Sequence, residues 1–213
     1  MNDPSPTPPA GHSVTLLAAT SIEARALRRA LPRARIVTAG VAFTAMREAL
    51  GDCVISCGVA GGLRSDLSTG AVLVPREIGL ADGSRRRCDD RLVELLAEGA
   101  RRLGVEPVFD PMLTADAIVT GEQRAHWAAR GFAAVDMETG RIAAPRIAAV
   151  RVVLDTPQHE LSPDWERPIL ALLKPWNWPQ AFWLAREAPR AADLAARVAA
   201  QGIGENIRIT RQW

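Results

Sequence analysis

Residues 53–63 read Cys-Val-Ile-Ser-Cys-Gly-Val-Ala-Gly-Gly-Leu, and this segment decides the fold class. Residues 53–57 are apolar except for Ser56, which is typical of a parallel strand buried on both faces of a sheet. Glycines follow at positions 58, 61 and 62. Glycine lets the backbone approach a ligand closely and exposes amide N–H groups to an anion or a sugar oxygen. The segment therefore predicts a buried strand that leads into a glycine loop at a binding site.

Short apolar runs alternate with helical patterns before and after this segment. Further strands are expected at residues 14–19, 35–39, 71–75, 117–120, 133–135 and 148–154. Helices are expected at residues 22–31, 44–50, 91–103, 122–130, 138–144 and 181–200, with Ser21 as an N-cap and Pro189 as an interruption. This alternation predicts an α/β fold in three layers, α/β/α, with a mostly parallel, twisted central sheet.

The length of 213 residues suits a single domain. Residues 1–12 are rich in proline and have neither a basic start nor an apolar core, so we expect a disordered tail and not a signal peptide. Residues 13–213 are expected to form the one folded domain.

Composition argues against nucleic-acid and membrane partners. The net charge of +2 is too small to indicate either. No apolar run reaches the roughly 18–20 residues that a membrane span needs, so no stable membrane insertion is expected. Cys53 and Cys57 lie in an apolar run, which indicates buried, inert thiols and a cytoplasmic protein. The histidines lack metal-ligand spacing, so we expect no metal.

Three acidic residues follow predicted strands closely. Glu23 comes a few residues after the first strand, Glu138 after the strand at 133–135, and Asp155 directly after the last strand. Ligands bind at the carboxyl ends of strands in an open parallel sheet, so these residues can converge on one crevice. Each acid taken alone could instead have a purely structural role, because acids near helix N-termini often stabilise the helix by interacting with its dipole.

The glycine segment has a rival interpretation as a dinucleotide-binding loop. Glu77 lies near the distance expected for an acid that binds the ribose of such a cofactor. A dinucleotide loop should open a helix, however, whereas Gly70 and Pro75 here bracket another short strand. The context therefore argues against a dinucleotide site.

Several segments, in this order along the chain, resemble the nucleoside phosphorylase/nucleosidase superfamily. They are residues 55–63 with 70–75, the ribose-binding segment Val-Asp-Met-Glu at 135–138, and the final strand Val-Arg-Val-Val-Leu-Asp at 150–155. Residues 18–23 are similar to the first strand of the methylthioadenosine/S-adenosylhomocysteine nucleosidase branch. The resemblance implies a catalytic domain that cleaves the N-glycosidic bond of an adenosine-type nucleoside and releases the purine base.

The resemblance also implies roles for particular residues. Glu138 would accept hydrogen bonds from the ribose hydroxyls and stabilise an oxocarbenium-like cation, and Met137 would pack against the sugar. Asp155 would hold a proton for N7 of the base, which requires a pKa above the ~3.9 of a free aspartate. Glu23 would position and deprotonate an attacking water.

Further residues are expected around the substrate. Ile118 and Val119 align with the stretch that flanks the base, and Arg151 is expected to orient a neighbouring acid. The backbone of the glycine segment is expected to approach the substrate at Gly58, Val59, Ala60 and Gly61.

The acceptor of the ribosyl group stays open at this point. Hexameric phosphorylases carry an arginine and a serine or threonine around the glycine loop to hold phosphate, whereas this chain has Ser56 and Val59 there. Glu23 also stands where those enzymes have an arginine, which favours water. The arginines Arg64, Arg85, Arg86 and Arg87 are candidate phosphate contacts, although such a run is more often a solvated loop. No cofactor is expected beyond phosphate as a candidate co-substrate.

The chain length and the region after Asp155 resemble the hopanoid-associated phosphorylases, which implies an adenosyl-lipid precursor with an apolar 5′ substituent. The tryptophans Trp165, Trp176, Trp178 and Trp183 are expected to pack the C-terminal helices onto the sheet; a groove for that substituent or a subunit interface is the alternative. Family resemblance suggests a homo-oligomer. The competing hypotheses are a methylthioadenosine/S-adenosylhomocysteine nucleosidase, a nucleoside-binding protein without turnover, and a structural subunit.

Overall fold

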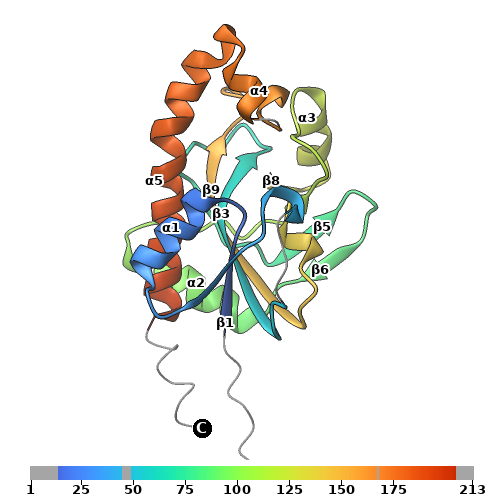
Figure 1. Cartoon of the computed structure of the whole chain (residues 1–213). Helices are drawn as coiled ribbons and strands as arrows, with labels where there is room; N and C mark the ends of the chain where they lie inside the picture. Colours follow the sequence, from blue (N-terminus) through green and yellow to red (C-terminus); the bar gives the residue numbers. More distant parts are fainter. Residues whose placement is uncertain (1–13, 45–48, 167, 205–213) are drawn as a thin grey trace, which may run out of the picture.

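The computed structural model describes residues 14–44, 49–166 and 168–204 (Figure 1). Its strands are β1 (Val14–Ala18), β2 (Arg35–Thr38), β3 (Cys53–Gly62), β4 (Val72–Leu73), β5 (Glu77–Leu80), β6 (Arg85–Arg87), β7 (Met112–Thr114), β8 (Ala134–Asp136) and β9 (Arg146–Asp155). Its α-helices are α1 (Ser21–Ala30), α2 (Asp90–Arg102), α3 (Glu122–Ala129), α4 (Pro168–Leu172) and α5 (Trp178–Ile203). Short 3₁₀ turns lie at η1 (Val41–Phe43), η2 (Thr139–Arg141), η3 (Pro163–Glu166) and η4 (Pro175–Asn177).

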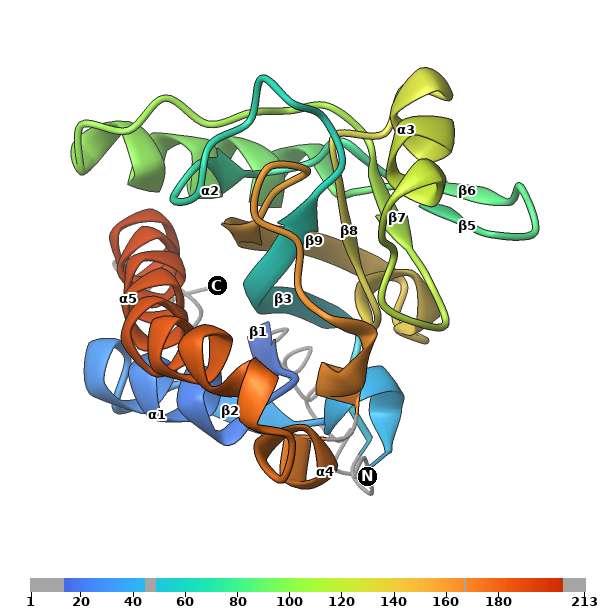
Figure 2. The ribbon, with the colours of Figure 1, turned by 90° about the horizontal axis from the view of Figure 1, so that it is seen from above.

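The predicted fold class is confirmed. The sheet runs in the order β2-β1-β3-β8-β7-β5-β6, and β9 pairs with both β3 and β4. The pairs of β1 with β2 and β3, of β3 with β9, and of β7 with β5 and β8 are parallel. Viewed from above, α1 and α5 lie on one side of β1, β3 and β9, and α2 and α3 lie on the other (Figure 2).

Strand β3 is longer than the sequence predicts. The expected strand ends at residue 57, followed by a glycine loop, whereas β3 continues to Gly62 and the glycines are part of the strand. The parallel ladder with β9 extends over this glycine half, where Gly58 pairs with Arg151 and Gly61 pairs with Asp155. Side chains from neighbouring elements occupy the space that Cβ atoms would fill, so the glycines keep strand geometry and make room.

Other predicted elements are wrong in part. Residues 117–120 are not a strand, because the carbonyl of Val119 accepts from the Arg124 side chain and the neighbouring strand is β7. The helix expected at 138–144 is only η2, since Gly140 packs against Thr114 of β7 and Pro145 ends the pattern. The expected helix at 44–50 falls largely on residues 45–48, outside the described residues.

Helix ends and the C-terminal helix also differ from expectation. The N-cap of α1 is Thr20 and not Ser21, because Thr20 and Glu23 form a reciprocal capping box. The prediction of an interruption at Pro189 is wrong, since α5 continues through it to Ile203. Packing of α5 against α1, α2, β3 and β9 outweighs the ~3 kcal/mol that an interior proline costs a helix.

The hairpin of β5 and β6 was not expected from the sequence. Its arginines are engaged locally: Arg85 pairs with Glu77, Arg86 donates to the carbonyls of Ile142 and Ala144, and Arg87 pairs with Asp90. The run is a strand and not a loop, because antiparallel pairing of Glu77–Gly79 with Arg85–Arg87 orders it. The expectation that it is solvated is confirmed for Arg85 and Arg87, which are exposed.

The tryptophans do not share one environment. Trp183 packs against the core, and Nε1 of Trp165 donates to Gln180. Trp176 and Trp178 are 71% and 53% exposed, so the prediction that they pack onto the sheet is wrong for these two. Cys53, Cys57 and Cys88 are buried and free, as expected for inert thiols, and burial raises the pKa of Cys57 to about 12. Within the described part of the chain, none of the helices has the length and apolarity to cross a membrane.

The packing of α2 on α5 depends on two facing glycines, and it generates a test. A Cβ on Gly99 would meet the carbonyl oxygen of Val198 and lie 2.6 Å from the backbone nitrogen of Gly202. Gly99→Ala is therefore expected to lower the free energy of unfolding by about 1–3 kcal/mol, although alanine is the better helix former. Urea denaturation measures this, with the exposed Gln201→Ala as control. Equal stability of Gly99→Ala and the wild type would contradict the close packing.

Candidate active site

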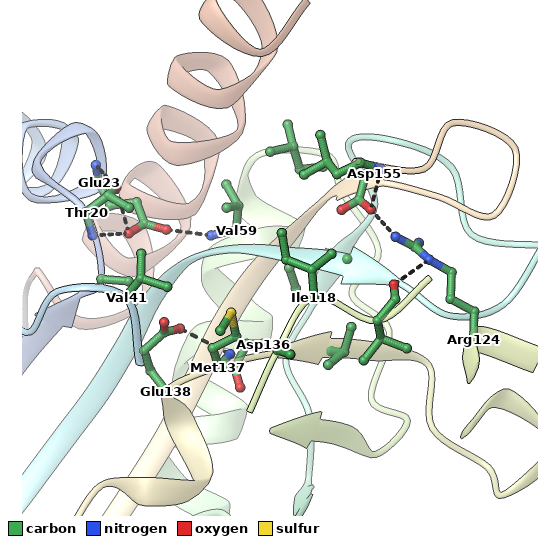
Figure 3. A pocket seen from close by; sticks show the side chains of 18 residues that line it. Thr20, Glu23, Val41, Val59, Ile118, Arg124, Asp136, Met137, Glu138 and Asp155 are labelled. Carbon is green, nitrogen blue, oxygen red and sulfur yellow. Dashed lines mark hydrogen bonds and ion pairs between the residues drawn. The ribbon is translucent and has the colours of Figure 1, made fainter. Parts of the chain in front are cut away.

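A cavity of about 220 Å³ opens at the carboxyl ends of β3 and β9. Its walls include all three predicted acids, Glu23, Glu138 and Asp155 (Figure 3). Glu23 and Glu138 lie toward one side of the cavity, and Asp155 lies on the opposite side, with Ile118 between them. The expectation that the three acids converge on one crevice is confirmed, because all three line this cavity. The expected cause is only partly right: β1 and β9 run parallel to β3, whereas β8 runs antiparallel to it and carries Glu138 back toward the middle of β3.

Glu23 bridges α1 and β3. Its Oε2 accepts from the Thr20 backbone N–H at 2.7 Å and from the Thr20 hydroxyl at 3.0 Å, which completes the capping box of α1. Its Oε1 accepts from the backbone N–H of Val59 at 2.9 Å. The structural interpretation of Glu23 is therefore confirmed, since the carboxylate caps α1; the same carboxylate also lines the cavity, where its functional role stays a prediction.

Gly58 makes the approach of Glu23 to β3 possible. A Cβ at this position would overlap Oε1 of Glu23 and would lie 2.7 Å from Nη1 of Arg151. Gly58 and Arg151, both predicted around the substrate, do not line the cavity. They lie directly behind it, where glycine provides the space that the two charged side chains occupy.

Glu138 is buried beside the strained segment that follows β2. Its Oε1 accepts from the backbone N–H of Ala42 at 3.0 Å. Ala42 and Phe43 have φ of 52° and 64°, a left-handed conformation that costs a residue with a Cβ about 1–2 kcal/mol. The bond to Glu138 holds this conformation, and Val41 beside it forms part of the cavity wall.

Arg151 lies at the centre of a buried polar network. Its Nη2 donates to Asp136 at 2.6 Å and to Ser56 at 2.7 Å, and it lies 3.6 Å from Oε2 of Glu138. Asp136 also accepts from Thr114 and from the backbone N–H of Thr139. Arg151 was expected to orient a neighbouring acid, and its bond to Asp136 and its proximity to Glu138 agree with that prediction. The network fixes the segment that carries Glu138.

A bulge in the β3–β9 ladder directs Asp155. Ala60 pairs with Val153, whereas Gly61 pairs with Asp155, so β9 contributes one extra residue at this point. Because side chains alternate along a strand, such a shift turns the following side chain to the other face. Oδ1 of Asp155 would lie 3.1 Å from a Cβ on Gly61, so the missing side chain leaves room for the carboxylate.

Arg124 of α3 forms a buried ion pair with Asp155. Its Nη2 contacts Oδ2, and the two side chains are almost fully buried. Burial raises the pKa of Asp155 above its ordinary value, and the Arg124 cation opposes that rise. Burial likewise raises the pKa of Glu138, against the attraction of Arg151 and with the repulsion of Asp136.

Most of the predicted binding residues line the cavity. Met137, Ile118 and Val119 do so, as do Val59, Ala60 and Gly61 of β3. The sequence reasoning missed Thr20, Val41, Arg124, Asp136 and Leu161, which line it as well. The Thr-x-x-Glu pattern at 20–23 is a capping-box signal that identifies Thr20. No comparable signal distinguishes Arg124, because a buried arginine looks like an exposed one in a single helix sequence.

The candidate phosphate contacts lie elsewhere. Arg64 pairs with Asp66 and Asp110, and neither Arg64 nor the arginines of β6 line the cavity. Ser56 is buried against Arg151 and faces away from the cavity walls. Among the lining residues that the structure describes, Arg124 carries the positive charge, and it is engaged with Asp155. Across residues 14–44, 49–166 and 168–204, no group of three or more His, Cys, Asp or Glu is placed to hold a metal ion.

The geometry suits one kind of chemistry. Carboxylates on one side of the cavity stabilise a positive charge that develops between them. On the opposite side, burial raises the pKa of the Asp155 carboxyl, which favours its protonated form and makes it a candidate proton donor. The apolar side chain of Ile118 lies between the two sides, and Met137 lies beside Glu138 (Figure 3).

Comparisons with known proteins agree with the fold. The family model described as "Phosphorylase superfamily" matches residues 31–160. The 5′-methylthioadenosine/S-adenosylhomocysteine nucleosidase of Neisseria meningitidis, solved with methylthio-immucillin-A, is similar with a TM-score of 0.68 at 19% identity, over 91% of this chain and 99% of that one. The S-adenosylhomocysteine nucleosidase of Streptococcus pyogenes, solved with 5-methylthiotubericidin, is similar with a TM-score of 0.70 at 16% identity, over 93% and 99%.

Futalosine hydrolase of Helicobacter pylori is a further similar structure, with a TM-score of 0.67 at 13% identity, over 92% of this chain and 98% of that one. A search of curated proteins finds no match to the chain.

The raised pKa of Glu138 generates a stability prediction. A carboxyl whose pKa rises on folding stabilises the fold fully below its unfolded pKa of ~4.3, and this contribution is lost as pH rises through the folded value. Glu138→Gln cannot ionise and still accepts a hydrogen bond from Ala42. Its stability relative to the wild type is therefore expected to increase from about pH 4 upward. Denaturation across pH measures this, with exposed Glu122→Gln as control; a difference independent of pH would contradict the account.

Proposed function

The chain belongs to the phosphorylase superfamily, and we propose that it cleaves the N-glycosidic bond of an adenosine-type nucleoside and releases the purine base. The observation that carries this proposal is the convergence of Glu23, Glu138 and Asp155 on one cavity from opposite sides. The named nucleosidases with the same fold support the choice of substrate class.

Glu138 acts on the ribose. One lone pair of Oε1 accepts from Ala42, which leaves further acceptor positions for the 2′- and 3′-hydroxyls of the sugar. As the C1′–N9 bond breaks, its electron pair moves to the purine and the sugar becomes cationic. The nearby negative charge of Glu138 stabilises that cation, and Met137 packs against the sugar face.

Asp155 acts on the base. Its raised pKa lets it hold a proton, which passes to N7 of the purine as the bond breaks, so that the base leaves neutral. Ile118 and Val119 flank the base in the cavity wall.

Water is the acceptor that the site favours. Glu23 is held at both oxygens, by Thr20 at the start of α1 and by β3, which fixes its position, while the remaining lone pair of Oε1 can orient and deprotonate a water. Phosphate would need cationic partners, and the arginine in the described cavity wall already pairs with Asp155. The similarity to nucleosidases and a hydrolase adds support for water.

The 5′ substituent of the substrate is apolar in this proposal, as in an adenosyl-hopanoid precursor. Six large apolar residues of the C-terminal region are about half exposed or more, and we call them the apolar C-terminal surface: Leu170, Leu172, Leu173, Trp176, Trp178 and Phe182. A second pocket adjoins the cavity at Leu161, which lines both, and its lining is mixed: it combines Leu161, Pro163 and Trp176 with the polar side chains of Thr120, Glu160, Ser162, Asn177 and Gln180. In this proposal an apolar chain on the ribose binds to the exposed side chains of that surface.

The proposal also includes a cellular compartment and an oligomeric state. Free, buried cysteines suit a reducing cytoplasm. A homo-oligomer remains part of the proposal, with the apolar C-terminal surface as the alternative contact between copies. A nucleoside-binding protein without turnover is the competing hypothesis, which the first experiment below separates from an enzyme.

Incubation of the purified protein with adenosine, methylthioadenosine and S-adenosylhomocysteine, with and without phosphate, tests the reaction. We expect adenine release both with and without phosphate, and a free, unphosphorylated sugar as the second product. Phosphate-dependent release would overturn water as the acceptor. Binding of nucleosides in calorimetry without release of base from any of them, or from a 5′-alkyl nucleoside, would overturn the enzyme proposal.

Asp155→Asn is expected to lower kcat/KM for adenine release by about 10²–10⁴-fold, because the base then leaves without its proton. Glu23→Gln is expected to lower it by a similar factor; the glutamine oxygen can complete the capping box with Thr20, but its NH2 group then faces the Val59 N–H, so the fold is checked separately. Adenine release and circular dichroism measure the two effects. Substantial activity of Glu23→Gln would contradict its role in water activation.

A series of 5′-alkylthio-adenosines of increasing chain length tests the apolar C-terminal surface. We expect kcat/KM to rise with chain length, and Trp176→Ser to lower it about tenfold for a long chain while leaving methylthioadenosine unchanged. Loss of activity toward both substrates together with a change in native mass would instead make the surface a contact between copies.

A further inference from the structure

Arg124 is a buried cation that the proposed reaction does not yet use. It is only 2% exposed. Its Nη1 donates to the Gly62 carbonyl at 2.6 Å, its Nε donates to the Val119 carbonyl at 2.9 Å and lies 3.3 Å from Oε1 of Glu160, and its Nη2 contacts Oδ2 of Asp155. One guanidinium therefore holds acceptors from the end of β3, from the segment before α3 and from the end of β9.

These acceptors belong to the walls around the base. Val119 ends the stretch 117–119, which lines the cavity without regular secondary structure. The hydrogen bond from Nε of Arg124 gives the Val119 carbonyl a donor, which in a regular sheet would come from a neighbouring strand. The backbone N–H of Gly121 donates to Glu160 at 2.9 Å, which ties the same stretch to the segment after β9. Arg124 thus connects the base-flanking stretch to the acid that acts on the base.

We propose that Arg124 is a positioning residue that makes Asp155 an effective proton donor, an inference that rests on the proposed function. Its contact is to Oδ2, which leaves Oδ1 beside Gly61 free to carry the proton to N7. When the proton leaves, Asp155 becomes a carboxylate, and the guanidinium stabilises that charge. The guanidinium stabilises the developing carboxylate more strongly in the transition state than in the ground state, so it lowers the activation free energy.

The charges around Asp155 define the expected pH effect. Arg124 from α3 faces it, Glu160 from the segment after β9 contacts the same guanidinium, and the backbone N–H of Leu161 lies 3.4 Å from Oδ2. Burial raises the pKa of Asp155 and Arg124 lowers it. Removal of the Arg124 cation therefore raises the pKa of Asp155, and the enzyme should stay active to higher pH. Asp155 is then also a weaker acid, so it protonates the purine more slowly.

The test compares Arg124→Met with the wild type and with Arg130→Met, an exposed arginine at the end of the same helix. Two substrates are used: methylthioadenosine, whose base needs a proton, and 4-nitrophenyl riboside, whose leaving group departs as an anion. For Arg124→Met we expect kcat for methylthioadenosine to fall by tenfold or more, with little change for the nitrophenyl riboside, and the alkaline limb of its pH profile to move up by about one pH unit or more.

Equal losses on the two substrates with an unmoved alkaline limb would overturn the proposal, because a purely structural arginine scales both activities alike. Loss of a buried partner can also unfold the protein, so Arg124→Lys is the second variant. Lysine keeps the charge but cannot hold Val119, Gly62 and Asp155 together. We expect its alkaline limb to stay near that of the wild type and its loss to be confined to methylthioadenosine; a loss on both substrates would again contradict the proposal.

The proposed cleavage reaction and the positioning role of Arg124 can be refuted separately. If the wild type releases no base from any nucleoside, the proposed function fails. If the wild type is active and neither Arg124 variant separates the two substrates, the function stands and the role of Arg124 fails.

Discussion

The parallel pairing of β3 with β9 is the constraint on which the candidate site depends. In this register Gly58 lies beside Arg151 and Gly61 lies beside Asp155, so each glycine provides space for a charged side chain. The same half of β3 donates the Val59 N–H that fixes Glu23. A side chain at Gly58 would displace Glu23 and Arg151 together, which explains why the glycines lie within a strand.

Buried charge is the physical cost of this arrangement. Arg151, Asp136 and Glu138 share one network, Arg124 and Asp155 form a second, and each network offsets the desolvation of its members by attraction and hydrogen bonds. The compensation is incomplete, since Nε of Arg151 is buried without a partner among the described residues and the pKa values of Glu138 and Asp155 are raised. The buried charges lower the free energy of unfolding, but they place the carboxyl groups of Glu138 and Asp155 where they can act on a substrate.

Much of the fold and of the site could be predicted from the sequence. Apolar runs identified β1, β3 and β9, because a strand buried on both faces is mostly apolar; the buried polar residues Ser56 and Arg151 are exceptions that serve the network behind the cavity. Glu23 and Asp155 could be placed in one crevice because they follow β1 and β9, which both run parallel to β3. The same rule does not explain Glu138, since β8 runs antiparallel to β3. The glycine segment misled the prediction, because glycine in isolation indicates a turn, whereas here its partner strand fills the space around it.

Other features depend on contacts between distant residues. Arg124 could not be assigned from α3 alone, since its partners lie in β3, in β9 and in the stretch before the helix. Trp176 and Trp178 looked like core residues by type, yet the segment between β9 and α5 leaves them exposed. Side-chain environment follows from tertiary position, which neither residue type nor local periodicity specifies.

The central claim is that the cavity stabilises a cationic sugar beside a purine. The most direct measurement is the affinity for two adenine-bearing inhibitors of the same shape, one with a cationic nitrogen in the sugar ring and one with a neutral carbocyclic ring. The account predicts that the cationic compound binds at least about 100-fold more tightly, and that Glu138→Gln removes most of this difference. Equal affinity of the wild type for the two compounds would contradict the account.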